Sequence, residues 1–343
     1  CHLNVFKTPI PVEVKNELSG QTATKDRIMN PPLRDNEWFI IQDSYEKATL
    51  ENRMMFLCAT RRAAKTTIIS SHLQHKALSG GKTLVVAGGS AKDLGHIETD
   101  FKITMKNAHP AFKMPNISND WSKLVKLGIK KKSGSDINPC NLSIFNLDGG
   151  VKSKSEILAG LTPDAFVLDE CMKSPFKQQL DGALPAFAVG GKFRFTPILS
   201  GTGGNEDLSK DAVKILKNPN DYQVSEMDWD KIEEKIDLED ITWTRREFGT
   251  FLPGQMSIEA QDLRTTTNLS VYLDVQNKVL EKIPIHITNW KEAKKRFKGR
   301  RKQKEKDKNS LYKEKVYFPL DPEDILLSGN ENPFRKDAIR RHK

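Results

Sequence analysis

The sequence predicts an α/β fold in which helices flank a mostly parallel central sheet. Three short apolar runs, around 56–59, 165–168 and 195–199, each lead into small or polar residues, as buried parallel strands do at one edge of a sheet. Helical patterns alternate with the strands, and this alternation implies that the strands run parallel. A length of 343 residues leaves room for a core domain and a smaller second one.

Local patterning predicts the remaining elements. After the first apolar run comes a tight loop and then a helix that begins at Lys65, and two glycines follow the end of this helix. Further strands are expected at 83–87 and 142–147, with a possible strand at 222–227. Helices are expected at 90–108, 208–216 and 229–236. Apart from the strand expected at 142–147, the stretch 109–155 shows a looser pattern, without a clear helix or strand.

Composition divides the chain into three regions. Residues 1–36 carry prolines and little periodicity, which indicates an N-terminal arm. Residues 37–254 form the predicted core domain, which closes at a Pro-Gly pair, and 255–343 form a small basic region. Within it, 291–308 holds eleven Lys or Arg against three acids. This run fits equally a helix edge that lies along phosphates and an unstructured polybasic linker.

The charge of the chain favours a polyanionic partner, since the net charge is +10. The candidate DNA contacts are Lys130, Lys131, Lys132, Lys294, Lys295, Arg296, Arg300 and Arg301. No run approaches the roughly 18 apolar residues of a membrane span, so we expect a soluble protein with no membrane partner. The four cysteines show no C-x-x-C spacing, which favours reduced thiols over disulfides or zinc.

The loop before Lys65 has the order of a phosphate-binding P-loop. Loop N–H groups and a helix N-terminus converge on an anion, while the lysine and the next hydroxyl reach the β/γ-phosphates and Mg²⁺. The two glycines of the usual pattern are replaced by Ala59 and Ala64, and alanine is disfavoured at positive φ. Taken alone, the loop fits equally a surface strand–helix connection. The predicted ATP-binding residues are Gln42, Arg61, Arg62, Ala63, Ala64, Lys65, Thr66 and Thr67.

The second and third apolar runs supply the other parts of a nucleotide site. Asp169 and Glu170 follow one strand, where the first acid is suited to hold Mg²⁺ with Thr66 and the second to activate water. Ser200, Gly201 and Thr202 follow the other strand and are placed to sense a γ-phosphate. Each feature alone is commonplace, but the three in this order indicate an ATP site of the P-loop NTPase class, in its ASCE form.

With these residues the chain resembles the ATPase half of the large terminase subunit, the DNA-packaging motor of tailed bacteriophages. The resemblance covers 37–254 and rests most on Arg61, because that family favours an arginine four residues before the lysine. Asp169 and Glu170 are similar to the second nucleotide-binding motif of that family, and 158–160 stand in the place of a small segment that precedes it. Residues 200–202 are similar to the family's coupling motif. Residues 317–324 resemble the segment found between the motor domain and the nuclease domain in some members of the family. The departures are the two loop alanines and a missing arginine before Gly160.

This resemblance implies an ATP-driven translocase of double-stranded DNA. Glu170 would be the catalytic base and Arg61 an arginine finger in cis, although Arg194, Arg245 or Arg246 of a neighbouring subunit are alternatives. A homo-oligomeric ring, a portal protein and a small terminase subunit are implied partners, in the cytoplasm of an infected host cell and at the procapsid portal. The nuclease domain of such subunits is not expected in this chain. A helicase-like DNA-dependent ATPase and a non-catalytic DNA-binding scaffold are the alternative functions.

Overall fold

The fold was analysed in a computed structural model of the chain. It describes residues 8–15, 22–29, 33–35, 41–78, 82–88, 91–107, 124–130, 136–147, 161–173, 176–203, 206–227, 248–273 and 278–326.

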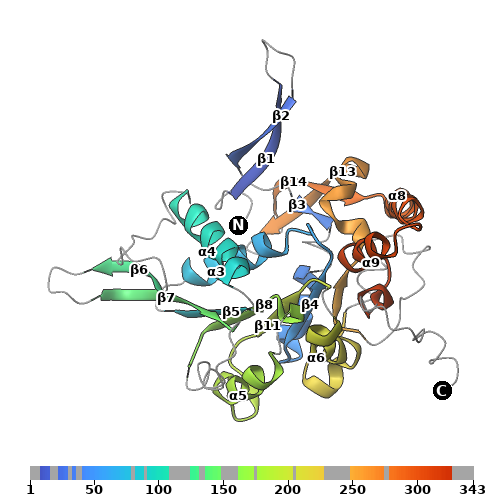
Figure 1. The fold of residues 1–343 in the computed structure, drawn as a ribbon. Coiled ribbons are helices and arrows are strands. Elements are labelled where there is room, and N and C mark those ends of the chain that lie inside the picture. Colours follow the sequence, from blue (N-terminus) through green and yellow to red (C-terminus); the bar gives the residue numbers. More distant parts are fainter. Residues whose placement is uncertain are drawn as a thin grey trace, which may run out of the picture.

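A seven-stranded sheet lies at the centre of the molecule (Figure 1). Its strands in spatial order are β12 (Thr250–Leu252), β4 (Met55–Ala59), β11 (Ile198–Gly201), β8 (Ala165–Asp169), β5 (Thr83–Gly88), β7 (Asp136–Asn146) and β6 (Leu124–Lys130). All neighbouring pairs are parallel except β6, which runs antiparallel to β7. The strand β11 separates β4, which leads into the loop, from β8, which carries the acids. This is the predicted ASCE order of a P-loop NTPase.

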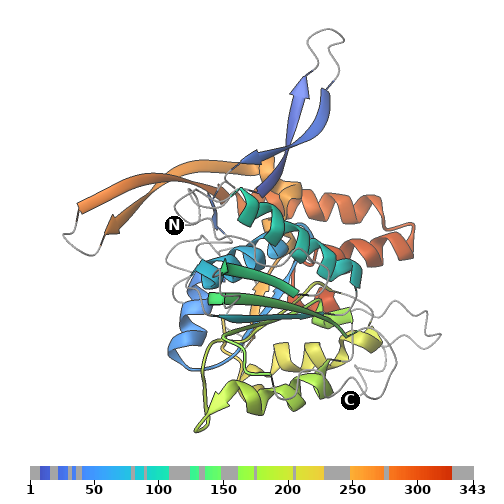
Figure 2. The ribbon, with the colours of Figure 1, turned by 90° about the vertical axis from the view of Figure 1, so that its left-hand side faces the viewer.

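Helices cover both faces of the sheet. The helices α3 (Lys65–Leu78) and α4 (Ala91–Lys106) lie on one face, and α5 (Lys177–Phe187) and α6 (Glu206–Lys217) lie on the other (Figures 1 and 2). Successive residues of a strand point to opposite faces. Accordingly, Leu84 and Val86 of β5 pack in the same apolar cluster as α3 and α4, whereas Val85 packs in the larger cluster with α5 and α6. Burial on both faces explains why the central strands are continuous apolar runs.

Most of the predicted elements of the core are confirmed. The strands at β4, β8, β11 and β5, the start of α3 at Lys65, and the helices α4 and α6 lie where the pattern places them. Two expectations for this region were wrong. The strand expected at 142–147 is confirmed as the second half of β7, but β7 already begins at Asp136 and is preceded by β6, so 109–155 holds more strand than expected. Residues 222–227 form an isolated bridge of Val224 with Met54, not a strand. The helix expected at 229–236 lies outside the described residues.

Smaller elements complete the part before residue 254. An antiparallel hairpin joins β1 (Thr8–Lys15) to β2 (Thr22–Met29), and it extends away from the body of the molecule (Figures 1 and 2). The helix α2 (Asp43–Leu50) precedes β4, and a short hairpin pairs β9 (Ala188–Val189) with β10 (Lys192–Phe193). The 3₁₀ segments of this part are Cys171–Lys173 and Pro219–Tyr222.

The region after residue 254 packs directly on the core. It contains the hairpin β13 (Arg264–Leu273) and β14 (Lys278–Thr288), which β3 (Leu33–Arg34) joins, followed by α8 (Trp290–Gln303) and α9 (Lys308–Tyr317). Its 3₁₀ segments are Gly254–Met256, Ile258–Leu263 and Pro322–Leu326. Trp290 and Ile325 belong to the main apolar cluster of the sheet. Most of the polybasic run is therefore the helix α8 and not an unstructured linker. Over the described ranges, no helix is long and apolar enough to cross a membrane.

Candidate active site

The loop between β4 and α3 places non-glycine residues in the left-handed region. Arg62 and Ala64 both have φ of 61°. Ala59, the other alanine in a glycine position, ends β4 and is not one of the positive-φ residues. A left-handed L-residue costs about 1–2 kcal/mol. Of the two substituted glycines, only the one at Ala64 imposes that cost, and the loop still closes so that the helix begins at Lys65.

Lys65 joins the loop to the acid-bearing strand. Its Nζ lies 2.5 Å from Asp169 Oδ1 and 2.8 Å from Glu170 Oε1, and its side chain is only 6% exposed. Asp169 ends β8 and Glu170 follows it, so both carboxylates reach the same edge of the sheet as the loop. The structure thus brings together the ammonium group and the two acids that the sequence places about a hundred residues apart.

Residues at the end of β11 and just after it hold the two acids. Ser200 Oγ donates to Asp169 Oδ1 at 2.6 Å, and Thr202 Oγ1 donates to Glu170 Oε2 at 3.1 Å. Lys173, which the sequence analysis does not single out, lies 3.1 Å from Glu170 Oε2 through its Nζ. The hydroxyl groups of Ser200 and Thr202 thus link both carboxylates to the end of β11.

Gly201 has a packing role between these two hydroxyl residues. A Cβ at Gly201 would lie 2.7 Å from Met172 Cγ and 3.3 Å from Cys171 Sγ. The absence of a side chain lets β11 approach the segment that follows Glu170, so the hydroxyls on either side of Gly201 can reach the acids.

The charges of the site depend on one another. Burial alone would raise the pKa of Glu170, but the ammonium groups of Lys65 and Lys173 outweigh it and lower this pKa to about 2. Burial opposes the charge of Lys65 as well, yet Asp169 and Glu170 raise the pKa of its ammonium group above the ordinary value. Glu170 is therefore an ionised carboxylate at neutral pH.

Two loop arginines point to different partners. The Arg61 guanidinium stacks on the Tyr317 ring, with 3.4 Å between its carbon and the ring centroid. Arg62 is exposed and pairs with Glu259, with 2.7 Å between Nη1 and Oε1. Tyr317 and Glu259 lie more than 190 residues from the loop, and no local pattern identifies them. Both arginines are thus tied to the region after residue 254.

The other predicted ATP-binding residues differ in position. Ala63 is buried in the loop, and Thr66 and Thr67 lie half-buried on the first turn of α3. Gln42 is exposed just before α2, and its amide donates to Glu46 at 2.9 Å.

The donor set suits Mg²⁺ better than a softer metal. Magnesium is commonly held by one or two carboxylates together with substrate phosphates, and a threonine hydroxyl completes such sites in P-loop proteins. Thr66 and Asp169 supply these oxygens at the edge where the loop lies. Across the described ranges, no group of three or more His, Cys, Asp or Glu forms a cluster that could hold a metal ion alone.

The predicted DNA contacts fall into two groups. Lys131 and Lys132 lie outside the described residues, and only the backbone of Lys130 is described, at the end of β6. The remaining five, Lys294, Lys295, Arg296, Arg300 and Arg301, all lie on α8.

The three arginines among these α8 cations form ion pairs with acids outside the helix. Arg296 binds both Asp262 oxygens, at 2.5 and 2.6 Å. Arg300 lies 2.8 Å from Glu314, and Arg301 lies 2.7 Å from Asp324. Lys295 lies 3.9 Å from Glu292 on the same helix, and its side chain is 80% exposed. Of the alternative arginine fingers, Arg194 is exposed beside β10, and Arg245 and Arg246 lie outside the described residues, as do 158–160.

Comparisons with known proteins found similar folds only among solved structures, since no protein family and no curated protein matches the chain. The large terminase ATPase domain of Thermus phage P74-26 is 14% identical over 45% of this chain and 61% of that one, with a TM-score of 0.36. The HK97 bacteriophage large terminase is 17% identical over 57% of this chain and 39% of that one, with a TM-score of 0.41. The large terminase of a thermophilic bacteriophage is 13% identical over 81% of this chain and 75% of that one, with a TM-score of 0.41.

The chain spans about six-tenths of the length of the P74-26 domain and about four-tenths of the HK97 protein. A more distant match is the Legionella pneumophila ATPase DotB, 9% identical over 84% of this chain and 60% of that one, with a TM-score of 0.28. All of these are partial matches at low identity with TM-scores below 0.5.

Proposed function

We propose that this chain is the ATP-hydrolysing motor subunit that translocates double-stranded viral DNA into a procapsid, the ATPase of a large terminase. The observation that carries the proposal is the convergence of Lys65 with Asp169 and Glu170 beside the loop–helix junction. The terminase assignment within the P-loop ATPases is supported by Arg61, four residues before the lysine.

The roles of the residues follow from their chemistry. Lys65 and the loop N–H groups hold the β/γ-phosphates, and Thr66 and Asp169 hold Mg²⁺, which when bound neutralises charge on the phosphates. Glu170 accepts a proton from the attacking water. Arg61 stabilises the charge that builds on the γ-phosphate, as an arginine finger does.

Binding of ATP requires Lys65 to exchange partners. Its ammonium group is held by both carboxylates, so phosphate oxygens must replace them. This exchange releases Glu170 toward water and alters the hydrogen bonds that Ser200 and Thr202 donate. The segment 200–202 thereby couples phosphate loss to movement of the domain.

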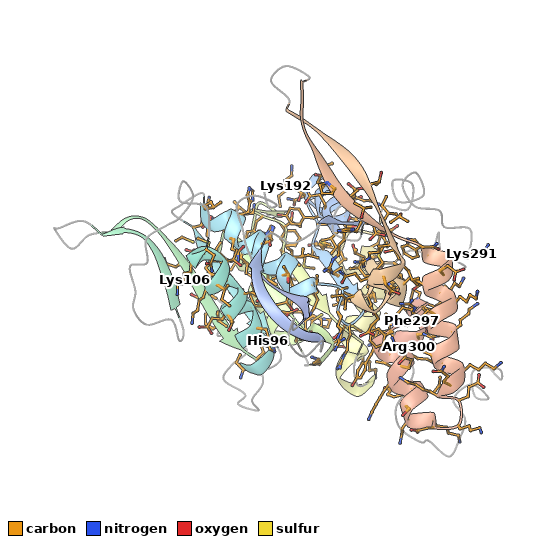
Figure 3. The ribbon with its side chains drawn as sticks, turned by 90° about the horizontal axis from the view of Figure 1, so that it is seen from above. His96, Lys106, Lys192, Lys291, Phe297 and Arg300 are labelled. Atoms are coloured by element: carbon orange, nitrogen blue, oxygen red, sulfur yellow. The ribbon has the colours of Figure 1, made fainter. Side chains whose placement is uncertain are left out.

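The DNA contacts are assigned to the outer face of α8. Lys291, Lys295, Lys298 and Lys302 are exposed and follow one another at intervals of four, three and four residues, which places them on one side of the helix. Figure 3 labels Lys291 at the start of α8, and Phe297 and Arg300 on the side that faces the rest of the molecule. These four lysines are called the α8 lysine face. They would bind phosphates, since a packaging motor must accept any sequence.

The wider assembly is proposed from the resemblance to the terminase family. A homo-oligomeric ring would dock at the portal with a small terminase subunit, in the cytoplasm of the infected cell. The division into an arm at 1–36, a motor at 37–254 and a basic region from 255 is part of the same proposal. Lys130, Lys131 and Lys132 remain further candidates for DNA contact.

ATP binding and hydrolysis, with and without double-stranded DNA, test the proposal. We expect Glu170→Gln to bind ATP in calorimetry while its turnover falls at least about a hundredfold, because the base is lost. Lys65→Ala loses binding as well, and Asp181→Asn, an exposed acid on α5, keeps both. Near wild-type hydrolysis by Glu170→Gln would contradict the assignment of the base.

The same preparations separate the alternatives. A wild-type protein that never hydrolyses ATP, with or without DNA, would favour the non-catalytic scaffold, for which the strained Ala64 is the supporting observation. Strand separation on forked DNA would favour the helicase-like ATPase. The motor hypothesis requires hydrolysis that duplex DNA stimulates, with no strand separation.

A further inference from the structure

The C-terminal end of α9 and the residues that follow it lie against the loop of the candidate active site. The Tyr317 carbonyl accepts two hydrogen bonds, from the Arg61 N–H at 2.9 Å and from the Thr60 hydroxyl at 3.0 Å. These bonds fix the backbone of residue 317 at the entrance of the loop, directly after the last residue of β4.

The same segment also contacts the ends of two neighbouring strands. The Gly254 N–H, just after β12, donates to the Pro319 carbonyl at 2.6 Å. A Cβ at Gly203 would lie 2.5 Å from the Val316 carbonyl oxygen, so the lack of a side chain there allows α9 to approach the end of β11. Residues 316–319 thus lie across the ends of β4, β11 and β12, and contacts with all three strand ends fix their position.

The Tyr317 ring then supplies a surface for the Arg61 guanidinium. The guanidinium carbon lies 3.4 Å from the ring centroid, so the cation lies over the negative face of the ring. Among the residues the structure describes, no carboxylate forms an ion pair with Arg61, whereas Arg62 pairs with Glu259. The ring is therefore the group that limits the rotamers of Arg61, a side chain that is otherwise exposed.

We infer that Tyr317 is a positioning residue, which holds Arg61 in place for the γ-phosphate. The inference rests on the proposed ATPase function, because it is through Arg61 that Tyr317 acts. An unrestrained arginine samples many rotamers. Fixing one of them in each turnover costs conformational entropy, so an unrestrained arginine finger contributes less to the rate. The stack requires the aromatic face and not the hydroxyl group, so phenylalanine can replace tyrosine.

The test measures steady-state ATP hydrolysis by Tyr317→Leu, Tyr317→Phe, Arg61→Ala and the Arg61→Ala/Tyr317→Leu pair. We expect Tyr317→Leu to lower kcat by about 3- to 30-fold, because that is the effect of losing a cation–π stack of this kind. The KM for ATP should change by less than about twofold. Tyr317→Phe retains the wild-type kcat. In the Arg61→Ala background, Tyr317→Leu causes no further fall.

Three results would overturn the inference: an unchanged or increased kcat in Tyr317→Leu, an equal loss in Tyr317→Phe, or a loss that multiplies with that of Arg61→Ala. If Tyr317→Leu does not fold, Tyr317→Met keeps the volume of the side chain without a ring face and replaces it in the cycle.

A second measurement separates failure of this inference from failure of the proposed function. The same four proteins are unfolded with denaturant in the absence of nucleotide, and the coupling between positions 61 and 317 is read from the double-mutant cycle. A measurable favourable coupling supports the stack even if the wild type shows no hydrolysis. A coupling of zero overturns it even if the wild type is active.

Discussion

Four residues of the site hold conformations or charges that an isolated chain disfavours. Arg62, Ala64 and Glu170 are left-handed, with φ of 61°, 61° and 53°, and Lys65 keeps its charge although its side chain is 6% exposed. The neighbours compensate: the acids hold the lysine, and Lys65, Lys173 and Thr202 hold Glu170. Strain of this kind is concentrated at functional sites, and here it lies on the loop and on the proposed base.

We predict that Ala64→Gly raises the free energy of unfolding by about 0.5 kcal/mol. Glycine removes a left-handed strain of about 1–2 kcal/mol but adds about 0.4–1 kcal/mol of unfolded-state entropy. Denaturant unfolding measures the difference. Ala63→Gly is the matched control, because Ala63 is buried without positive φ, and it should lower the free energy of unfolding by about 1 kcal/mol. Equal destabilisation by both changes would argue against strain at Ala64.

The charge on Glu170 predicts a dependence of stability on pH. Its pKa is lowered in the folded state from the ordinary 4.5 to about 2, so its contribution is complete above the ordinary value and is lost as pH falls through this window. The free energy of unfolding should therefore fall more steeply between these pH values in wild type than in Glu170→Gln. Parallel pH profiles for the two proteins would contradict the pairing with Lys65 and Lys173.

At the scale of a single element, α8 separates two kinds of cation. Arg296, Arg300 and Arg301 form ion pairs with Asp262, Glu314 and Asp324, and they fasten the helix to neighbouring segments. The α8 lysine face points to solvent. A run that is one block of positive charge in the sequence therefore divides into cations that stabilise the fold and cations available to a polyanion.

Removing part of the α8 lysine face should weaken binding to duplex DNA and its dependence on salt. For Lys291→Ala/Lys298→Ala/Lys302→Ala, the slope of log K against log[salt] should decrease in magnitude by about 2.7, which is about 0.9 for each lost phosphate contact. Fluorescence anisotropy at several salt concentrations measures this slope.

The control for that experiment removes three exposed lysines on other elements, at Lys192, Lys210 and Lys214. It has the same net charge as the test variant. If the two triple variants give the same slope, the effect reflects overall charge, and the α8 lysine face is not the DNA contact.

For the whole molecule, the C-terminal region shares its core with the sheet. The main apolar cluster includes Met256, Ile285, Trp290 and Ile325 together with the strands. A second cluster, built around Phe297 of α8, contains Ala260, Ala293 and Leu320. Phe297 stacks on Phe318 at 5.5 Å between ring centroids, next to the segment that contacts the loop. Apolar contact is thus continuous from the sheet to α8.

This continuity predicts one cooperative unfolding transition in calorimetry. Phe297→Ala removes a fully buried ring and should shift the whole transition, with a loss of about 3–5 kcal/mol. Lys298→Ala, on the exposed side of the same helix, should change stability by no more than about 0.5 kcal/mol. Two separate transitions, of which Phe297→Ala moves only one, would instead indicate independent domains.

Local patterns were sufficient for the elements that form the phosphate site. The strands β4 and β8 are buried on both faces, so they form uninterrupted apolar runs, and the change to polar residues marks where each strand ends. The start of α3 at Lys65 follows from the same change of pattern. By contrast, the hairpin of β1 and β2 and the strand β6 were missed, although their partners are neighbours in the chain. Ile10, Val12 and Val14 alternate with polar or proline residues, and so do Val125, Leu127 and Ile129 with lysine and glycine, so a period-of-two pattern could have found them.

By itself, the sequence determined the α/β class and the three chain positions whose charges meet: Lys65, Asp169 and Glu170. It did so because each lies where an apolar run ends, and the ends of parallel strands share one edge. Only the tertiary structure decided that Tyr317 lies under Arg61 and that the α8 arginines are bound to acids. Those contacts join residues far apart in the chain, and their formation depends on how whole elements pack, which no local pattern encodes.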